Sequence, residues 1–178
     1  MNMEKDRARL LRGVMGGLTT GAPIGVLIEN KDHESWVGKE VVAYTAPRPG
    51  HADLNGVVKY GYKDIRNVLE RASARETAAR VAVGAICRSL LEQFDIVVGG
   101  YVTSIGTVRA DLDSVPYPER FMKAKKSDVK CPDPQAAVAM QDEIQGIIDL
   151  KDTLGGVIEI VALNLPVGLG SHVHWDRR

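Results

Sequence analysis

The residues best suited to chemistry lie in one stretch, from Arg48 to Arg80, where basic side chains and a histidine are concentrated. The stretch carries seven basic residues: Arg48, Lys59, Lys63, Arg66, Arg71, Arg75 and Arg80. Four acidic residues oppose them, namely Asp53, Asp64, Glu70 and Glu76. Seven minus four leaves a local excess of three positive charges in a chain of zero formal net charge. His51 follows a Pro-Gly turn at the start. Clustered arginines, an isolated histidine and a helix start indicate a site for a phosphorylated ligand with a proton donor beside it.

The helix start lies near the end of this stretch. Ser73 and Glu76 have the spacing of a capping box, in which each side chain bonds the other residue's backbone N–H. The run that follows, to about Phe94, spaces its apolar residues as a buried amphipathic helix does: Ala74, Ala78, Val81, Ala82, Ala85, Cys87, Leu90 and Leu91. Capping boxes also begin ordinary core helices, so the pattern alone leaves open whether Ser73 only caps a helix or belongs to a ligand site.

The same stretch resembles chorismate synthase, a flavin-dependent enzyme family that ends the shikimate pathway. The similar segments are R-P-G-H-A-D from Arg48 to Asp53, K-Y-G from Lys59, D-I-R from Asp64, and E-R-A-S-A-R-E-T-A-A-R from Glu70 to Arg80. Two further segments, 19–30 and 155–177, agree with the family as well. The resemblance therefore runs through nearly all 178 residues.

The resemblance implies a reaction and a set of roles. The family eliminates phosphate from 5-enolpyruvylshikimate 3-phosphate to give chorismate, and it needs reduced FMN. His51 matches the histidine beside the flavin, whose protonation it would control, while Arg48 and Arg75 match substrate-binding arginines. The resemblance implies that Arg71, Ala72 and Ser73 contact the flavin, although some members have serine where Ala72 stands. A loop arginine that only pairs with Asp53 is the less favoured interpretation of Arg48, and Asp64 and Arg66 are expected to pair structurally.

The resemblance also bears on completeness and assembly. Family members are longer at both ends and assemble as homotetramers, so the chain is expected to be the central part of such an enzyme. A non-catalytic fragment that folds, or that binds FMN or a phosphorylated ligand weakly, is the alternative. Whether NADPH reduces the flavin on the protein is left open by the sequence.

Composition favours an ordinary soluble protein. A chain of 178 residues with 44% hydrophobic and 26% charged residues suits a single domain, 1–178, with a sizeable core. Zero net charge argues against a general nucleic-acid binder. Cys87 and Cys131 make neither a metal-ligand spacing nor a disulfide framework, and Cys87 is expected to be an inert buried thiol. With no signal peptide and no membrane-length apolar run, a cytoplasmic location is expected.

Two other histidine-bearing segments are weaker candidates for chemistry. His33 lies in a polar segment, 30–36, that is expected to be a loop, so a solvated surface role is favoured. His172, His174 and Asp176 alternate, which would place three ligands on one strand face. The resembling family needs no such metal, so no metal site is expected.

The remaining pattern predicts the elements that must hold the site. Strands are expected at 9–15, 23–29, 96–108 and 157–163, with extended chain at 40–44 and an irregular proline loop at 46–50. Helices are expected at 52–60, 63–71, 74–94 and 134–150, the last capped by Asp133 with Ala137, Met140, Ile144, Ile147 and Ile148 on its inner side. The polar segment 109–134 is interpreted as a long connection with a solvated lysine run. The pattern supports an α/β (α+β) fold, and the resemblance implies a β-α-β sandwich of antiparallel sheets with outer helices.

Overall fold

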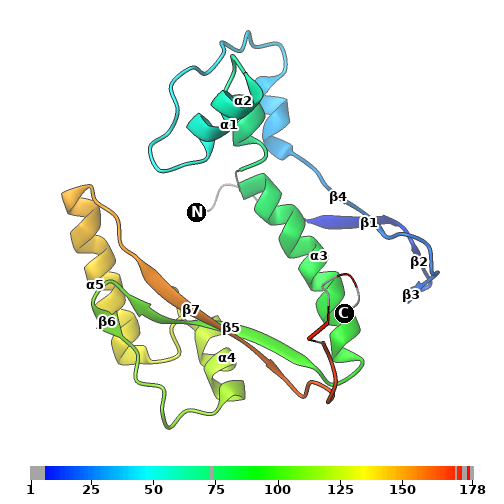
Figure 1. Ribbon diagram of the computed structural model, residues 1–178, viewed down its shortest axis with the longest axis vertical. Helices are drawn as coiled ribbons and strands as arrows, with labels where there is room; N and C mark the ends of the chain where they lie inside the picture. The colour runs from blue at the N-terminus through cyan, green and yellow to red at the C-terminus, as the bar shows by residue number, and fades with distance from the viewer. Residues whose placement is uncertain (1–6, 73, 171, 174–175, 177–178) are drawn as a thin grey trace. The chain divides into compact units, whose positions relative to one another are not determined.

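Groups of antiparallel strands and groups of helices follow one another along the chain in the computed structural model (Figure 1), which describes residues 7–72, 74–170, 172–173 and 176. The chain divides into two compact units, residues 1–87 and 88–178. The sheets of both units are antiparallel, so the expected α+β class is confirmed. That the two units together make one domain stays a prediction.

The first unit begins with a two-stranded antiparallel sheet in which β1 (Ala8–Arg12) pairs with β4 (Gly25–Ile28). The single strand expected at 9–15 is interrupted at Gly13, whose φ is +84°. A Cβ there would stand 2.7 Å from the Pro23 carbonyl oxygen, so both the backbone angle and the space require glycine.

Beyond Gly13 a small hairpin forms, with β2 (Val14–Met15) paired to β3 (Leu18–Thr19). The segment expected to be a loop contains a 3₁₀ helix, η1 (Lys31–Trp36). No strand forms at 40–44, although the Tyr44 carbonyl oxygen accepts a hydrogen bond from the Ile65 N–H at 2.9 Å.

Three helices complete the first unit. α1 (Asp53–Tyr60) and α2 (Arg66–Leu69) occupy the two stretches expected to be helical, although α2 is shorter than expected. They pack closely, because a Cβ on Gly56 would stand 2.7 Å from a methyl group of the buried Val68. α3 (Ala74–Glu92) follows and continues past residue 87 into the second unit.

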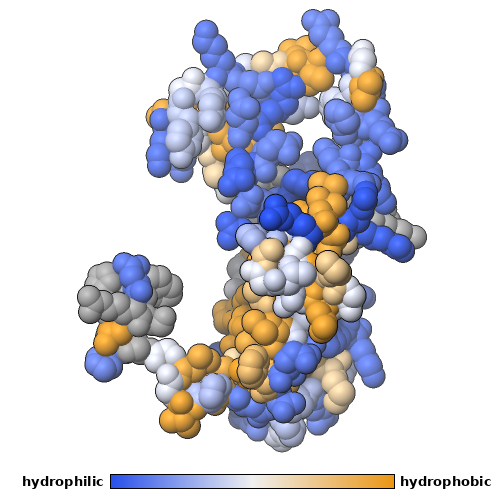
Figure 2. Space-filling view, turned by 90° about the vertical axis from the view of Figure 1, so that its right-hand side faces the viewer, coloured by the Kyte–Doolittle hydropathy of each residue, from blue (hydrophilic) through white to orange (hydrophobic). Residues whose placement is uncertain are grey.

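The expected burial of the long helix α3 is not observed. Val81 is 66% exposed and Leu90 61% exposed, and Cys87 is exposed rather than buried. Apolar residues occur around most of this helix instead of along one stripe, so no single packing face can cover them all. Figure 2 shows hydrophobic residues, in orange, over a broad area of the surface in that view.

The second unit is built on a three-stranded antiparallel sheet in the order β6-β5-β7. The strands are β5 (Val97–Ile105), β6 (Val108–Arg109) and β7 (Gly156–Leu163). The expected strand at 96–108 turns back at Gly106, whose φ is +56°, so β5 and β6 form a hairpin. The expected glycine-marked bend is therefore a chain reversal.

The helix α4 (Tyr117–Lys126) corrects the interpretation of 109–134 as an unstructured connection. Prolines at its first positions suit a helix start, because those N–H groups need no partner within the helix. Phe121 and Ala124 are buried against β5, and Tyr101 lies 6.2 Å from Phe121 between ring centroids. The lysine run is the last turn of this helix, where positive charge complements the helix dipole.

The helix α5 (Pro134–Leu150) begins where the sequence predicts. The Asp133 carboxylate accepts hydrogen bonds from the N–H groups of Gln135 (2.9 Å) and Ala136 (3.2 Å), which confirms the N-cap. Met140 is fully buried beside Cys131. Ile148, expected on the inner side, is 59% exposed and is not part of the buried cluster around Met140. Among the described helices, none is long and apolar enough to cross a membrane.

Candidate functional site

The loop from Arg48 to Asp53 is closed on itself by an ion pair. The Asp53 carboxylate accepts hydrogen bonds from Arg48 at three atoms: the main-chain N (3.0 Å), Nε (2.9 Å) and Nη2 (3.1 Å). Asp53 is completely buried, whereas the Arg48 side chain is 43% exposed. Arg48 lowers the pKa of Asp53 to about 2, mainly through these side-chain hydrogen bonds. The pairing that the sequence made the less favoured interpretation of Arg48 is therefore present in the structure.

His51 lies exposed inside this loop, with its ring turned back on the chain. Its Nδ1 lies 2.9 Å from the Pro49 carbonyl oxygen. Because a carbonyl oxygen only accepts hydrogen bonds, Nδ1 carries the proton in this contact, and Nε2 is the nitrogen that would accept a proton. Gly50, with φ of +70°, makes the turn that allows the ring to fold back.

A cavity of about 400 Å³ brings Arg71 and Arg75 together. Its apolar wall comes from Val26, Leu27 and Ile28 of β4 and from Ala79, Ala82 and Val83 of α3. Glu70 and Glu76 also line it, so two arginines and two glutamates leave the lining without a net charge. An apolar wall beside guanidinium groups is the environment that a planar ring bearing a phosphate requires.

The two arginines of this cavity differ in their partners. Arg71 Nη1 lies 3.2 Å from the Glu76 carboxylate, which also pairs with Arg80 at 3.5 Å. Arg75 reaches from α3 to the end of β4, where Nη2 donates to Asn30 Oδ1 (3.3 Å) and Nη1 to the Glu29 carbonyl oxygen (3.5 Å). Arg75 is thus held beside the cavity by contacts with the residues that follow β4.

Most arginines of this stretch pair with its acidic residues. Arg48 pairs with Asp53, and Arg71 and Arg80 share Glu76. Arg66 pairs with Asp64, as expected, and lies 5.7 Å from the Tyr44 ring centroid. These acidic residues are already subtracted in the sequence count, so the local excess of three positive charges remains.

The remaining flavin-contact candidates are only partly described. The Ala72 N–H donates to the carbonyl oxygens of Val68 (3.0 Å) and Leu69 (3.1 Å), so it is already used within the chain. Ser73, and with it the capping box, lies outside the described residues. The structure therefore leaves the role of the Ser73 hydroxyl as a prediction.

A second cavity, of about 350 Å³, lies in the same unit and shares Glu70 with the first. Its lining includes two exposed aromatic residues, Trp36 and Tyr44, together with Arg66 and His33. His33 is exposed, as expected. His51 lines neither cavity.

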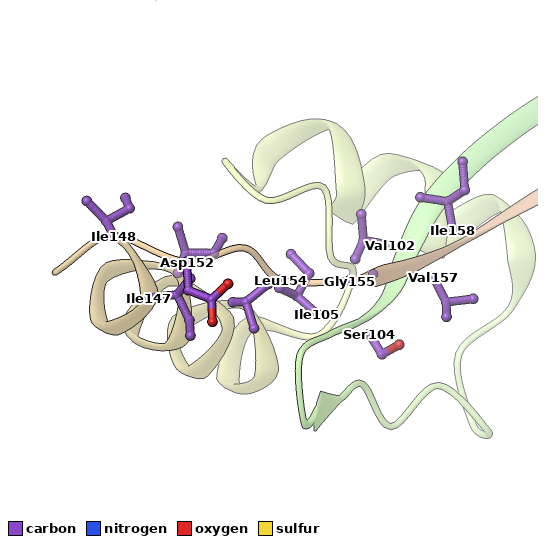
Figure 3. Close-up of a pocket in the computed structure, with 12 residues that line it drawn as sticks. Val102, Ser104, Ile105, Ile147, Ile148, Asp152, Leu154, Gly155, Val157 and Ile158 are labelled. Atoms are coloured by element: carbon purple, nitrogen blue, oxygen red, sulfur yellow. The ribbon is translucent and has the colours of Figure 1, made fainter. Parts of the chain in front are cut away.

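A third cavity, of about 460 Å³, belongs to the second unit and is mainly aliphatic. Figure 3 shows Ile147 and Ile148 of α5 beside it, with Val102 and Ile158 of the sheet. None of the residues predicted for the site lines it. Without an arginine or histidine in its lining, it is not a candidate for the anion site.

The structure describes only part of the segment in which His172, His174 and Asp176 alternate. His174 lies outside the described residues, while His172 and Asp176 lie within them. The part of the chain that the structure describes contains no group of three His, Cys, Asp or Glu side chains arranged to hold a metal ion.

Sequence reasoning missed the residues that hold the candidate arginines. Asn30 and the Glu29 carbonyl contact Arg75 across more than 40 residues, and no local spacing signals such a contact. The complete burial of Asp53 was also not expected. The available signal was an Arg and an Asp five residues apart, with one proline and a glycine between them.

Comparison with known proteins gives one consistent result. A family model described as chorismate synthase matches residues 1–178. The chain is 48% identical over 187 residues to the chorismate synthase of Trichlorobacter lovleyi and 51% identical over 189 residues to that of Desulforudis audaxviator. Each alignment covers 100% of this chain and 48% of the relative.

A solved structure described as the crystal structure of chorismate synthase is similar with a TM-score of 0.81 and 42% sequence identity. The similarity covers 98% of this chain and 50% of that one. The chain therefore spans about half the length of the relatives it matches. The fold expected from the sequence resemblance is confirmed.

Proposed function

The chain belongs to the chorismate synthase family, and on that premise we propose that it takes part in the reduced-FMN-dependent conversion of 5-enolpyruvylshikimate 3-phosphate to chorismate. The reaction breaks the C–O bond to phosphate and removes one ring hydrogen, with no net oxidation or reduction. It is a lyase step of aromatic amino acid biosynthesis. The supporting observation is that a family match over 178 residues includes a stretch in which His51 and the arginines lie in one compact unit.

The cavity at Arg71 and Arg75 fits FMN by its chemistry. Its aliphatic wall suits a flat ring, and its guanidinium groups suit a phosphate. Reduced FMN, when bound, supplies a transient electron that helps phosphate leave. Arg71, Ala72 and Ser73 would hold the cofactor, and Arg75, anchored by Asn30, would face the bound anions.

Arg48 and His51 supply the remaining chemistry in this proposal. The exposed edge of the Arg48 guanidinium would bind a phosphate or carboxylate of the substrate, which places positive charge where negative charge develops. His51, with its proton on Nδ1, would exchange a proton through Nε2 near neutral pH. Aliphatic residues around the cavity would exclude water from the reaction.

Flavin binding and turnover test this proposal separately. FMN fluorescence is titrated against the wild-type chain and Arg75→Ala, with Arg88→Ala as a matched control on the same helix. Weaker binding to Arg75→Ala alone supports the cofactor site, whereas equal affinity for all three removes Arg75 from it. Chorismate formation is then followed by absorbance under strict anaerobiosis with dithionite-reduced FMN.

The two results together separate the proposal from its alternative. FMN binding with chorismate formation supports the enzymatic role. FMN binding without turnover supports the alternative of a chain that binds the flavin but does not catalyse. We also propose the homotetramer and the cytoplasmic location that the family resemblance implies, and sedimentation analysis of the purified protein tests the former.

A further inference from the structure

Asp53 combines full burial with a negative charge. Its exposed fraction is 0%, and it is the buried charged residue among those that the structure describes. A buried carboxylate is costly unless charged hydrogen bonds compensate it. Asp53 obtains that compensation from Arg48, at the main-chain N, Nε and Nη2. The Asp53 carboxylate is therefore paired with Arg48.

The two side-chain hydrogen bonds from Arg48 to the Asp53 carboxylate fix the orientation of the Arg48 guanidinium. Nε and Nη2 face the carboxylate, and the bond to the Arg48 main-chain N anchors the same residue at a third point. The hydrogen bonds that Arg48 makes to Asp53 leave Nη1 unused. Since the side chain is 43% exposed, Arg48 presents a held N–H edge to solvent.

The ion pair between Arg48 and Asp53 also restricts His51, which lies between them in the loop. Pro47, Pro49 and Gly50 restrict the loop backbone, and the Pro49 carbonyl oxygen fixes the His51 ring at 2.9 Å. His51 also lowers the pKa of Asp53, so the imidazole lies within electrostatic range of this carboxylate. Both groups of this loop that the proposed function uses are thus tied to Asp53.

The Asp64–Arg66 ion pair in the same unit provides a comparison. Its arginine also forks onto a carboxylate through Nε and Nη2. The guanidinium, however, lies over the Tyr44 ring, and the two side chains are similarly exposed, at 34% and 24%. The pair at Asp53 differs, because its anion is buried and its cation faces outward.

We propose that Asp53 is a positioning residue that holds the Arg48 guanidinium toward an anionic oxygen group, a phosphate or carboxylate, of the substrate, and that closes the loop carrying His51. This inference rests on the proposed function, in which Arg48 binds the substrate and His51 exchanges a proton. It assigns to Asp53 the orientation of these groups and no contact with the substrate.

Side-chain NMR of Arg48 tests the positioning without enzyme activity. In the wild-type chain the Arg48 Nε–H gives a resolved signal that exchanges slowly with water. Asp53→Asn removes the charge and leaves one acceptor oxygen for the three Arg48 N–H donors, so the signal broadens and exchanges faster. Asp64→Asn, the matched control, leaves the Arg48 signal unchanged. An Arg48 signal unaltered by Asp53→Asn overturns the proposal.

Titration with inorganic phosphate tests the consequence for binding. We expect phosphate to bind about tenfold more weakly to Asp53→Asn than to the wild type, because a charged hydrogen bond is lost from a held geometry. Asp64→Asn stays within about twofold of the wild type. If Asp53→Asn does not fold, Asp53→Glu keeps the buried charge but displaces the fork by one methylene, and its phosphate affinity falls several-fold. Wild-type affinity in Asp53→Asn or in Asp53→Glu overturns the proposal.

Kinetics separate this inference from the proposed function. On protein that forms chorismate, Asp53→Asn raises KM for the substrate and leaves FMN affinity unchanged, while a merely structural role would weaken both. If the wild type forms no chorismate, the proposed function fails, and the NMR and phosphate results still decide the role of Asp53.

Discussion

At the scale of single residues, the protein places carboxylates where they set the direction of arginine side chains. Asp53 and Asp64 each accept a forked hydrogen bond from a nearby arginine, and each has its pKa lowered to about 2 from an ordinary 3.8. Both carboxylates therefore stay ionised in the folded protein under conditions in which they begin to protonate in the unfolded chain. The stability that these two carboxylates contribute therefore depends on pH.

The lowered pKa values predict a specific loss of stability in acid. A carboxylate whose folded pKa is depressed stabilises the fold above its unfolded pKa, and the contribution is lost as pH falls through the folded value. The free energy of unfolding should therefore decline between about pH 4 and about pH 2. Urea midpoints measured across this range should fall less steeply in Asp53→Asn and Asp64→Asn. Slopes equal to that of the wild type would contradict the prediction.

The exposed imidazole of His51 carries the second prediction at this scale. A proton-transfer residue contributes about 10²–10⁴-fold in rate, so His51→Ala should lower kcat by that factor and change KM little. Phosphate release from the active protein is measured anaerobically with reduced FMN. His33→Ala, which removes another exposed histidine of the same unit, is the control. Turnover of His51→Ala within about twofold of the wild type would exclude the role.

At the scale of elements, the contact between β5 and α4 decides how the second unit packs. Gly99 lies under the Phe121 ring, and a Cβ at Gly99 would overlap that ring. The glycine thus allows α4 to approach the sheet closely, and the buried Tyr101, Phe121 and Ala124 depend on this approach.

This contact predicts opposite effects for two identical substitutions. Gly99→Ala should destabilise the fold by about 1–3 kcal/mol, because the added methyl overpacks the core. Gly146→Ala, in α5 with open space around the new Cβ, should instead stabilise it by about 0.5–1 kcal/mol through helix propensity. Urea unfolding of both variants provides the comparison. A destabilised Gly146→Ala would show that a factor other than space at the Cβ governs these positions.

At the scale of the whole molecule, each unit contains one cysteine, and the two differ in environment. Cys87 is exposed on α3, whereas Cys131 is buried beside Met140. Burial raises the pKa of the Cys131 thiol, which further disfavours the reactive thiolate. The reactivity of Cys87 therefore reports on the surface of α3, and that of Cys131 reports on the core of the second unit.

Thiol labelling turns this difference into a prediction. With Ellman's reagent at pH 8, Cys87 should react at once, while Cys131 should react only as the second unit unfolds in urea. Cys87→Ser isolates the slow reaction, and Cys131→Ser isolates the fast one. Protection of Cys87 in the native protein would show that this part of α3 is covered in solution.

The sequence by itself determined those features that depend on neighbours in the chain. Asp133 followed by proline specified the start of α5, because a cap requires only the next N–H groups. The signature from Arg48 to Arg80 is a local pattern that indicates the family, which the family match confirms. The Asp64–Arg66 pair, two residues apart, was equally accessible.

Only the tertiary structure decided which partners each charged or apolar side chain meets. The helix α4 was missed because its four neighbouring prolines and lysines suggested a loop, and only packing on β5 explains the burial of Phe121. The expected burial of Cys87 was wrong. Because α3 is apolar on several sides, the spacing of its apolar residues does not predict which side of the helix is covered. Asn30 meets Arg75 through β4, and a contact across 45 residues is set by the folded path and by no local pattern.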